Sequence, residues 1–225
     1  MLKCFFIAVI LIYIAPVSAQ QIISSAHKDG VSIRGLSILD DNNAWISGSK
    51  GTVAYTNDAG KSWNWLQVPQ YENRDFRDIE LLDEHTVLIM AIDTPAVILR
   101  TDDKGLHWNK VLEDKRSGMF LDAMSFNGKK AVVVGDPIEG QFYISTSNNY
   151  GKTWKAAKQT SVNTGGCFAS SGTNVAWRNN DFYTVTGGKN SELLLRNHGL
   201  SIPITRGKET TGQIPSHLTQ TKKQK

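Results

Sequence analysis

Thr56-Asn57-Asp58-Ala59-Gly60-Lys61-Ser62-Trp63 is the stretch that decides the fold, because the chain repeats it twice more. The pattern returns as Thr101-Asp102-Asp103-Lys104-Gly105-Leu106-His107-Trp108 and as Ser147-Asn148-Asn149-Tyr150-Gly151-Lys152-Thr153-Trp154. All three copies fit Ser/Thr-x-Asp/Asn-x-Gly-x-x-Trp, and they begin 45 and 46 residues apart (56 to 101, 101 to 147). A fixed period of this size indicates a repeat architecture.

Each position of the octapeptide has a physical role in a tight hairpin. The third residue accepts hydrogen bonds from backbone N–H groups of its own turn, and it is Asp58, Asp103 or Asn149. The fifth allows a positive φ without steric cost, and it is Gly60, Gly105 or Gly151. The eighth places a large apolar body at the start of the outgoing strand, and it is Trp63, Trp108 or Trp154.

Four short strands are predicted around each octapeptide, because β-branched and aromatic residues fill these runs and Gly, Asn, Asp and Pro separate them. The expected first strands are 32–36, 75–79, 119–123 and 167–171, and the second are 44–48, 86–91, 131–135 and 182–187. The expected third strands are 52–56, 97–101, 142–147 and 193–196, and the fourth are 62–68, 107–112, 153–157 and 200–205. Four strands in about 45 residues is the period of a β-propeller blade.

The repeated octapeptide resembles the Asp box, or BNR repeat, of sialidase-like β-propellers. Other segments resemble secreted propellers related to photosystem II assembly and stability factors; they are 75–80, 118–123, 135–137 and 167–174. The resemblance extends from about Val31 to Gly212. It implies an all-β propeller of four-stranded blades and a precedent for binding proteins, but no reaction.

Both ends of the chain differ from the repeats. Met1 to Ala19 has a basic start at Lys3, a short apolar core and a Val17-Ser18-Ala19 cleavage pattern, so we expect a signal peptide cleaved before Gln20. A signal anchor is the alternative. After cleavage no transmembrane segment is expected, and the chain is predicted to be periplasmic or secreted. The last residues, 213–225, are polar and basic without alternation, and we expect a disordered tail.

The sequence between the two ends leaves the number of blades open. Residues 20–212 hold about four units, and the fourth lacks an Asp box. Seven blades, as the resemblance implies, would need roughly 315 residues. The sequence therefore favours part of a seven-bladed fold over a closed four-bladed ring, for which Gln21 to Ser25 is the candidate closing strand. An open run of blades leaves apolar faces in water, so we expect the chain to be poorly soluble or self-associating.

Candidate binding residues lie at the starts of the first strands, near the predicted channel. Arg34, Arg77, Asp78 and Asp122 occupy matching places and would recognise a charged group of a partner, or else pair with neighbouring blades and seal the channel. A second set lies on loops of the face opposite the Asp boxes and includes Asp136 and Glu139. A solvated rim is the alternative for these loops.

No cofactor, metal or nucleic-acid site is predicted. The chain has a formal net charge of +4 and no basic stripe interleaved with aromatic residues. It has no phosphate-cradling loop and no His-Glu-x-x-His motif, and Cys167 is expected to be a small buried hydrophobe. Some relatives are labelled oxidoreductases, but no cofactor motif supports that label here.

The preferred function is therefore a non-catalytic extracytoplasmic propeller that binds or helps assemble a protein or a surface component. The alternative is a sialidase-type glycoside hydrolase, incomplete in this chain. Such enzymes commonly place an arginine in Arg-Ile-Pro, whereas the order here is Ile33-Arg34-Gly35. Asp boxes are structural, so they do not imply glycosidase activity.

Overall fold

The computed structural model describes residues 26–157, 165–167, 172–188, 190–195 and 198–201, and every regular element within them is a β-strand. Blade 1 comprises β1 (Ile33–Ile38), β2 (Ala44–Gly48), β3 (Thr52–Thr56) and β4 (Asn64–Gln67). Blade 2 comprises β5 (Phe76–Leu81), β6 (Val87–Ala91), β7 (Ala96–Thr101) and β8 (Asn109–Asp114). Blade 3 comprises β9 (Leu121–Asn127), β10 (Lys130–Ile138), β11 (Gln141–Ser147) and β12 (Lys155–Ala156). Blade 4 comprises β13 (Val175–Arg178), β14 (Asp181–Val185), β15 (Glu192–Leu195) and β16 (His198–Ser201).

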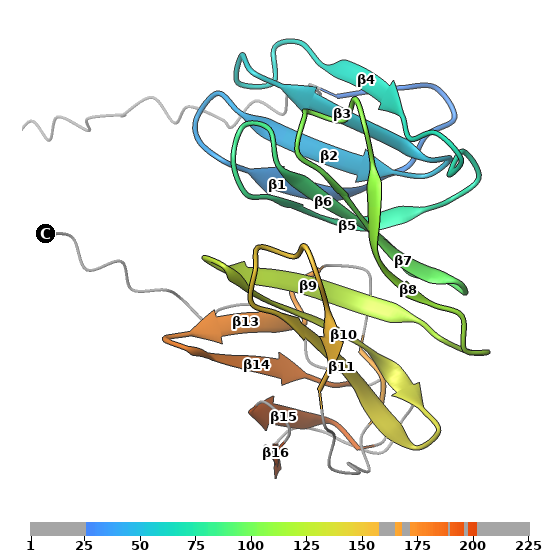
Figure 1. The fold of residues 1–225 in the computed structure, drawn as a ribbon, viewed down its shortest axis with the longest axis vertical. Coiled ribbons are helices and arrows are strands. Elements are labelled where there is room, and N and C mark those ends of the chain that lie inside the picture. The colour runs from blue at the N-terminus through green and yellow to red at the C-terminus, as the bar shows by residue number, and fades with distance from the viewer. Residues whose placement is uncertain (1–25, 158–164, 168–171, 189, 196–197, 202–225) are drawn as a thin grey trace, which may run out of the picture.

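The four blades follow one another in chain order, and each is an antiparallel four-stranded sheet. The first strand of each blade is its inner strand, and inner strands of consecutive blades contact one another: β1 with β5, β5 with β9, and β9 with β13. In Figure 1 the blades descend from blade 1 at the top to blade 4 at the bottom. This arrangement confirms the all-β fold of four-stranded propeller blades, about four of them in this chain, that the repeat predicts.

Three apolar clusters fill the spaces between successive blades. The cluster between blades 1 and 2 includes Trp45 and Phe76, and the cluster between blades 2 and 3 includes Met90 and Leu121. The cluster between blades 3 and 4 includes Phe142. In the part of the chain that the structure describes, no fourth cluster joins blade 4 to blade 1, so these blades form an open arc. The candidate closing strand at Gln21 to Ser25 lies outside the described residues.

Each Asp box closes its hairpin with the same set of hydrogen bonds. In the second box, Asp103 Oδ1 accepts the backbone N–H of His107 at 2.9 Å, as expected. The opening hydroxyl has a role that the sequence analysis did not assign. Thr101 Oγ1 accepts the backbone N–H of Gly105 at 2.9 Å and donates to Asp103 Oδ1 at 2.8 Å. Thr56 and Ser147 make the corresponding bonds in the other boxes.

The turn itself contains two successive residues with positive φ. The glycines Gly60, Gly105 and Gly151 have φ of 78°, 84° and 74°, and the residues before them, Ala59, Lys104 and Tyr150, have φ of 61°, 60° and 59°. This pair of left-handed residues is the geometry of a type I′ hairpin turn. The glycine is further required by packing, since a Cβ on Gly151 would lie 2.6 Å from Leu88 Cδ2 of blade 2.

The box tryptophans lie just before their outer strands and pack towards the preceding blade. Trp108 is only partly buried, against the cluster between blades 1 and 2, and Trp154 likewise packs against the cluster between blades 2 and 3. Trp63 belongs to none of the three clusters. Blade 1 is the first of the arc, so its box tryptophan has no preceding blade among the described residues.

The predicted strands of blades 1 to 3 all overlap observed strands, although several ends differ, as at β9, where 119–123 was predicted and Leu121–Asn127 is observed. The pairs at 44–48 and 52–56 have the predicted bounds. The inner strand of blade 4 was predicted at 167–171, of which 168–171 lie outside the described residues; the described strand β13 begins at Val175. A hydrogen bond from Gly187 N to Gly166 O (2.7 Å) corresponds to one from Asp136 N to Phe120 O (3.0 Å) in blade 3. This correspondence places Cys167 at the entry to blade 4, in the position that Leu121 has in blade 3.

Candidate functional site

The inner strands of blades 1, 2 and 3 each carry a β-bulge near their start. The register skips one residue between Ile33 and Gly35 and between Phe76 and Asp78. It also skips the residue that follows Leu121, the partner of Gly135. The extra residues are Arg34, Arg77 and Asp122, which we call the bulge row. A bulge leaves its extra residue outside the ladder and re-aims its side chain.

The bulge row corrects the alignment inferred from the sequence. That alignment placed Leu121, not Asp122, at the position of Arg77. The inner strand of blade 3 is therefore displaced by one residue relative to the expected repeat. Once the displacement is included, three charged residues of successive blades hold equivalent places, whereas Asp78 follows the bulge and belongs to a different position.

The two arginines of the bulge row differ in their partners. Arg34 Nη2 lies 3.8 Å from Asp75 Oδ2, and both side chains are partly exposed, so this ion pair contributes little to stability. Arg77 is half-buried, and its Nε is buried with no hydrogen-bond partner among the described residues. A buried donor left without an acceptor costs about 1–3 kcal/mol. Arg77 thus holds an unused donor at the inner strand.

Asp78 joins blade 2 to blade 3. Its Oδ2 accepts the backbone N–H of Met124 on β9 at 2.6 Å, and its Oδ1 accepts the N–H of Ile79 at 2.9 Å. Burial raises the pKa of Asp78 to about 7, although both hydrogen bonds oppose the shift. The first hydrogen bond joins two neighbouring blades, which is the alternative in which Asp78 seals the channel and does not bind a partner.

Glu80 was not singled out from the sequence, although strand alternation places it on the same face as Asp78. Burial, and then repulsion from Asp78, raise the pKa of Glu80 well above its usual value. The signal available in the sequence was two carboxyl groups two residues apart on one strand. It was missed because only the first residues of the strand were considered as site candidates.

Asp122 and Asp136 form a pair of carboxyl groups in blade 3. Asp122 is 1% exposed, and burial, then the charge of Asp136, raise its pKa to about 8. Both carboxyl oxygens of Asp122 are buried without a hydrogen-bond partner among the described residues, which disfavours the charged form of the group. Burial also raises the pKa of Asp136, whose Oδ1 accepts the backbone N–H of Cys167 at 3.2 Å.

Glu139 does not join this pair. It lies at the tip of the β10–β11 hairpin, where Glu139 and Gly140 have φ of 53° and 74° and the side chain is exposed. The structure therefore separates two residues that the sequence analysis grouped on one loop: Asp136 packs inward between blades, and Glu139 points to solvent.

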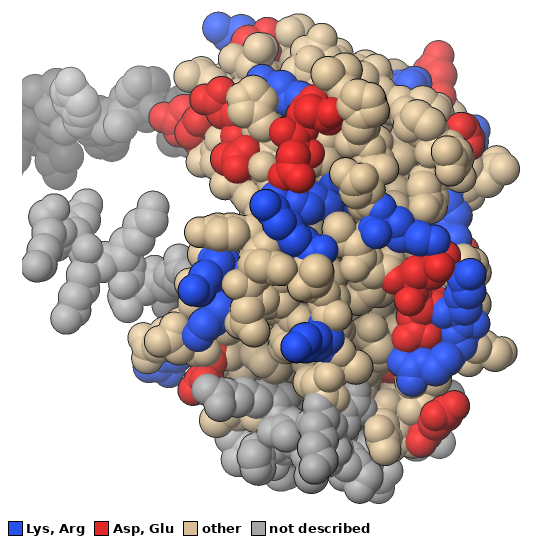
Figure 2. All heavy atoms as spheres, viewed as in Figure 1, with Lys and Arg blue, Asp and Glu red and all other residues tan. Residues whose placement is uncertain are grey.

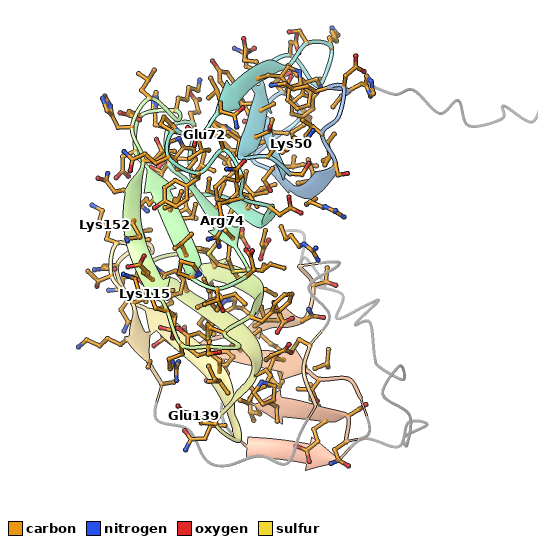
Figure 3. The ribbon with its side chains drawn as sticks, turned by 90° about the vertical axis from the view of Figure 1, so that its right-hand side faces the viewer. Lys50, Glu72, Arg74, Lys115, Glu139 and Lys152 are labelled. Atoms are coloured by element: carbon orange, nitrogen blue, oxygen red, sulfur yellow. The ribbon has the colours of Figure 1, made fainter. Side chains whose placement is uncertain are left out.

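The other rim loops use several of their charges locally. Figure 3 shows Lys50, Glu72 and Arg74 in its upper half and Lys115 and Glu139 below them. Arg74 donates to the carbonyl oxygens of Asp93 (2.8 Å) and Pro95 (2.7 Å), which ties two loops together. On the face drawn in Figure 2, a band of Lys and Arg crosses the middle and Asp and Glu gather above it. The rim is thus a surface of mixed charge.

Cys167 is partly buried and packs against the cluster between blades 3 and 4. Its Sγ donates to the carbonyl oxygen of Val185 at 3.3 Å, and burial raises its pKa well above the usual value. A high pKa disfavours the thiolate, which is the nucleophilic form. Within the described residues no cluster of His, Cys, Asp and Glu side chains suited to a metal ion is found. Nor does any helix there have the length and apolar character to cross a bilayer.

Three features define a BNR-type β-propeller. They are the Asp-box hairpins, the four-stranded blades that follow one another along the chain, and the contacts between inner strands of consecutive blades. The chain belongs to the family of the photosynthesis system II assembly factor YCF48, whose model matches residues 19–186.

The similarity to individual proteins is lower and covers only part of each. The chloroplastic photosystem II stability/assembly factor HCF136 of Arabidopsis thaliana is 28% identical over 140 residues, which is 59% of this chain and 33% of the relative. A structure of YCF48 bound to D1 peptide superposes with a TM-score of 0.53 at 18% identity, covering 80% of this chain and 54% of that one. The chain thus spans about a third of its curated relative and about half of the YCF48 structure.

Glycoside hydrolases share the fold as well. The GH74 enzyme of Niastella koreensis superposes with a TM-score of 0.51 at 15% identity, and the match covers 76% of this chain and 24% of the enzyme. At this identity the likeness concerns the fold alone. It therefore adds no support to the glycoside hydrolase alternative.

Proposed function

We propose that this chain is a non-catalytic, extracytoplasmic β-propeller that binds another protein and takes part in its assembly. The observation that carries the proposal is the placement of Arg34 and Arg77 at equivalent bulges in the inner strands of adjacent blades, where Arg34 is exposed and Arg77 is half-buried. Two guanidinium groups at matching places can pair with acceptor groups of a partner.

The relatives support a protein as the partner. HCF136 is described as a photosystem II stability/assembly factor, and one YCF48 structure contains a D1 peptide. The partner of this chain is an unidentified protein or cell-envelope component. Export rests on the leader at Met1 to Ala19, which lies outside the described residues. The function of the complete relatives is extended here to a chain that covers a part of them.

A pull-down from envelope extract tests the bulge row. The bait is the full chain, and Arg34→Gln/Arg77→Gln is compared with Lys61→Gln/Lys152→Gln, which removes the same charge from exposed Asp-box positions. We expect a partner that is enriched by the wild type and the control and is reduced at least tenfold by the arginine variant. Equal recovery by both variants would refute the role of the bulge row. Turnover of fluorogenic glycosides would contradict a non-catalytic function.

A further inference from the structure

The Asp-box end of blade 3 carries the opposite charge from the same end of blades 1 and 2. At this end each of these blades has two hairpin tips, one between its first and second strands and one at the box. In blades 1 and 2 acidic side chains outnumber Lys61 and Lys104 at the tips; they are Asp40, Asp41, Asp58, Asp83, Glu84, Asp102 and Asp103. The tips of blade 3, at 127–130 and 148–153, contain lysines and no acidic residue.

The backbone that joins the two tips is the same in all three blades. The fourth residue of each box donates its backbone N–H to a carbonyl oxygen of the other tip. The pairs are Ala59 with Asn42 (3.1 Å), Lys104 with His85 (3.0 Å) and Tyr150 with Lys129 (2.9 Å). The reversal of charge in blade 3 therefore comes from its side chains alone, on a scaffold that the blades share.

A tip of blade 4 continues this basic surface. Asn127 Nδ2 donates to the carbonyl oxygen of Asn179 at 2.7 Å, which joins the β9–β10 tip to the β13–β14 tip, and both hairpins end at the left of Figure 1. Arg178, beside Asn179, is exposed, whereas Asp181 on the opposite strand is half-buried. We call Lys129, Lys130, Tyr150 and Arg178 the basic corner. Among the described residues its three cations form no ion pair.

Tyr150 presents an aromatic ring beside these cations. Its φ of 59° lies in the left-handed region, which a bulky residue rarely adopts. The residue is 50% exposed and belongs to none of the three apolar clusters. Its backbone is fixed on both sides, because Lys129 accepts its N–H and the buried guanidinium of Arg100 donates to its carbonyl oxygen. The fold therefore holds this ring in a fixed place without gaining core packing from it.

We infer that the basic corner binds an acidic segment of a partner protein. Carboxylates pair with lysine and arginine, and tyrosine is enriched at protein interfaces, where it supplies a large, rigid contact area. An anionic bilayer fits less well, because a flat surface that reached the basic corner would also approach the acidic tips of blades 1 and 2 and be repelled by them. A short acidic segment can lie on blades 3 and 4 alone. The bulge row lies at the other end of the inner strands, so this is a second and separate contact.

The test is the fluorescence anisotropy of a labelled hexaglutamate peptide with a central leucine, titrated with the full chain. We expect binding at low ionic strength that weakens as salt is added. Lys129→Gln/Arg178→Gln should weaken the binding of this probe about fivefold. The control, Lys61→Gln/Lys110→Gln, removes the same charge from exposed positions of blades 1 and 2 and should change the affinity less than about twofold. Thermal unfolding checks that each variant is folded.

Tyr150→Asn separates binding from folding. Asparagine tolerates the left-handed conformation better than tyrosine, so the melting temperature should stay the same or rise while the probe binds more weakly. Unchanged binding by this variant would contradict the role assigned to the ring.

Other results would overturn the proposal. One is a wild type that does not bind the probe, and another is an equal loss in the two double variants, which would reflect net charge alone. Tighter binding of phosphatidylserine vesicles or of polygalacturonate, lost in Lys129→Gln/Arg178→Gln, would assign the basic corner to a lipid or to an acidic polysaccharide. Loss of the probe only in Arg34→Gln/Arg77→Gln would place it on the bulge row. The pull-down test of the bulge row changes neither Lys129 nor Arg178, so the two proposals can fail separately.

Discussion

The hydroxyl that opens each Asp box should matter more to stability than the acidic residue after which the motif is named. Thr101 is fully buried, and its Oγ1 accepts the backbone N–H groups of Asp103 (3.2 Å) and Gly105 (2.9 Å). It also donates to Asp103 Oδ1 at 2.8 Å. Thr101→Val keeps the shape of the side chain and removes all three bonds at once.

The expected cost follows from these contacts. A hydrogen bond contributes about 1 kcal/mol net, and a buried donor left unsatisfied costs about 1–3 kcal/mol, so Thr101→Val should lower the free energy of unfolding by about 2–4 kcal/mol. Asp103→Asn should cost less than about 1 kcal/mol, because an amide oxygen still accepts the His107 N–H. The third box already works in this way, with Asn149 Oδ1 accepting the N–H of Thr153 at 3.0 Å.

Urea unfolding followed by tryptophan fluorescence measures the difference, with Trp108 as a reporter close to the mutated turn. Protein concentration must be held constant, since association shifts the midpoint by mass action. Equal midpoints for Thr101→Val and the wild type, or a larger loss for Asp103→Asn than for Thr101→Val, would refute the assignment of the hydroxyl as the centre of the box.

Three further predictions concern pH, packing and processing. The pKa values of Asp78 (about 7) and Asp122 (about 8) are raised in the fold, so the neutral forms of these groups stabilise it. The melting temperature should therefore fall as pH rises from about 4 to 8. In a calorimetric pH series, Asp122→Asn should make that fall smaller. The lowered pKa of Asp103, about 2, acts in the opposite sense, because its stabilisation is present above pH 4 and is lost as pH falls towards 2. Trp108→Ala should lower the free energy of unfolding by about 2–3 kcal/mol, less than for a fully buried tryptophan. Trp63→Ala should lower it less than Trp108→Ala does in the unassociated chain. Equal losses of unfolding free energy in denaturant melts would contradict this difference in packing. N-terminal sequencing of exported protein should begin at Gln20, and a retained leader in the membrane fraction would favour a signal anchor.

The hairpins were predictable because their information is local. The box between the third and fourth strands of a blade, with its fixed glycine and acidic residue, leaves little freedom in the register of that hairpin. The third strand that leads into the first box has the predicted bounds, 52–56. The presence of four blades follows in the same way from the period. The role of the Thr101 hydroxyl was also available in the sequence, since every box begins with Ser or Thr, but it was not assigned.

The inner strands were less predictable because a bulge is not visible in an apolar pattern. Phe120 and Leu121 are both apolar, so nothing in the sequence alone shows which of them matches Phe76. The pairing of Asp122 with Asp136 depends on contacts between separate strands, which no local pattern specifies.

The bulge row also bears on how such a protein diversifies. A residue inside a strand is constrained twice, by its ladder partner and by the core it faces, so most replacements there damage the fold. Arg34, Arg77 and Asp122 stand outside that alternation, and their own cores are built by neighbours such as Phe76 and Leu121. At the exposed Arg34 and the half-buried Arg77, selection can therefore change the charge that one blade presents while leaving the packing between blades unchanged. Asp122 is 1% exposed and does not have this freedom.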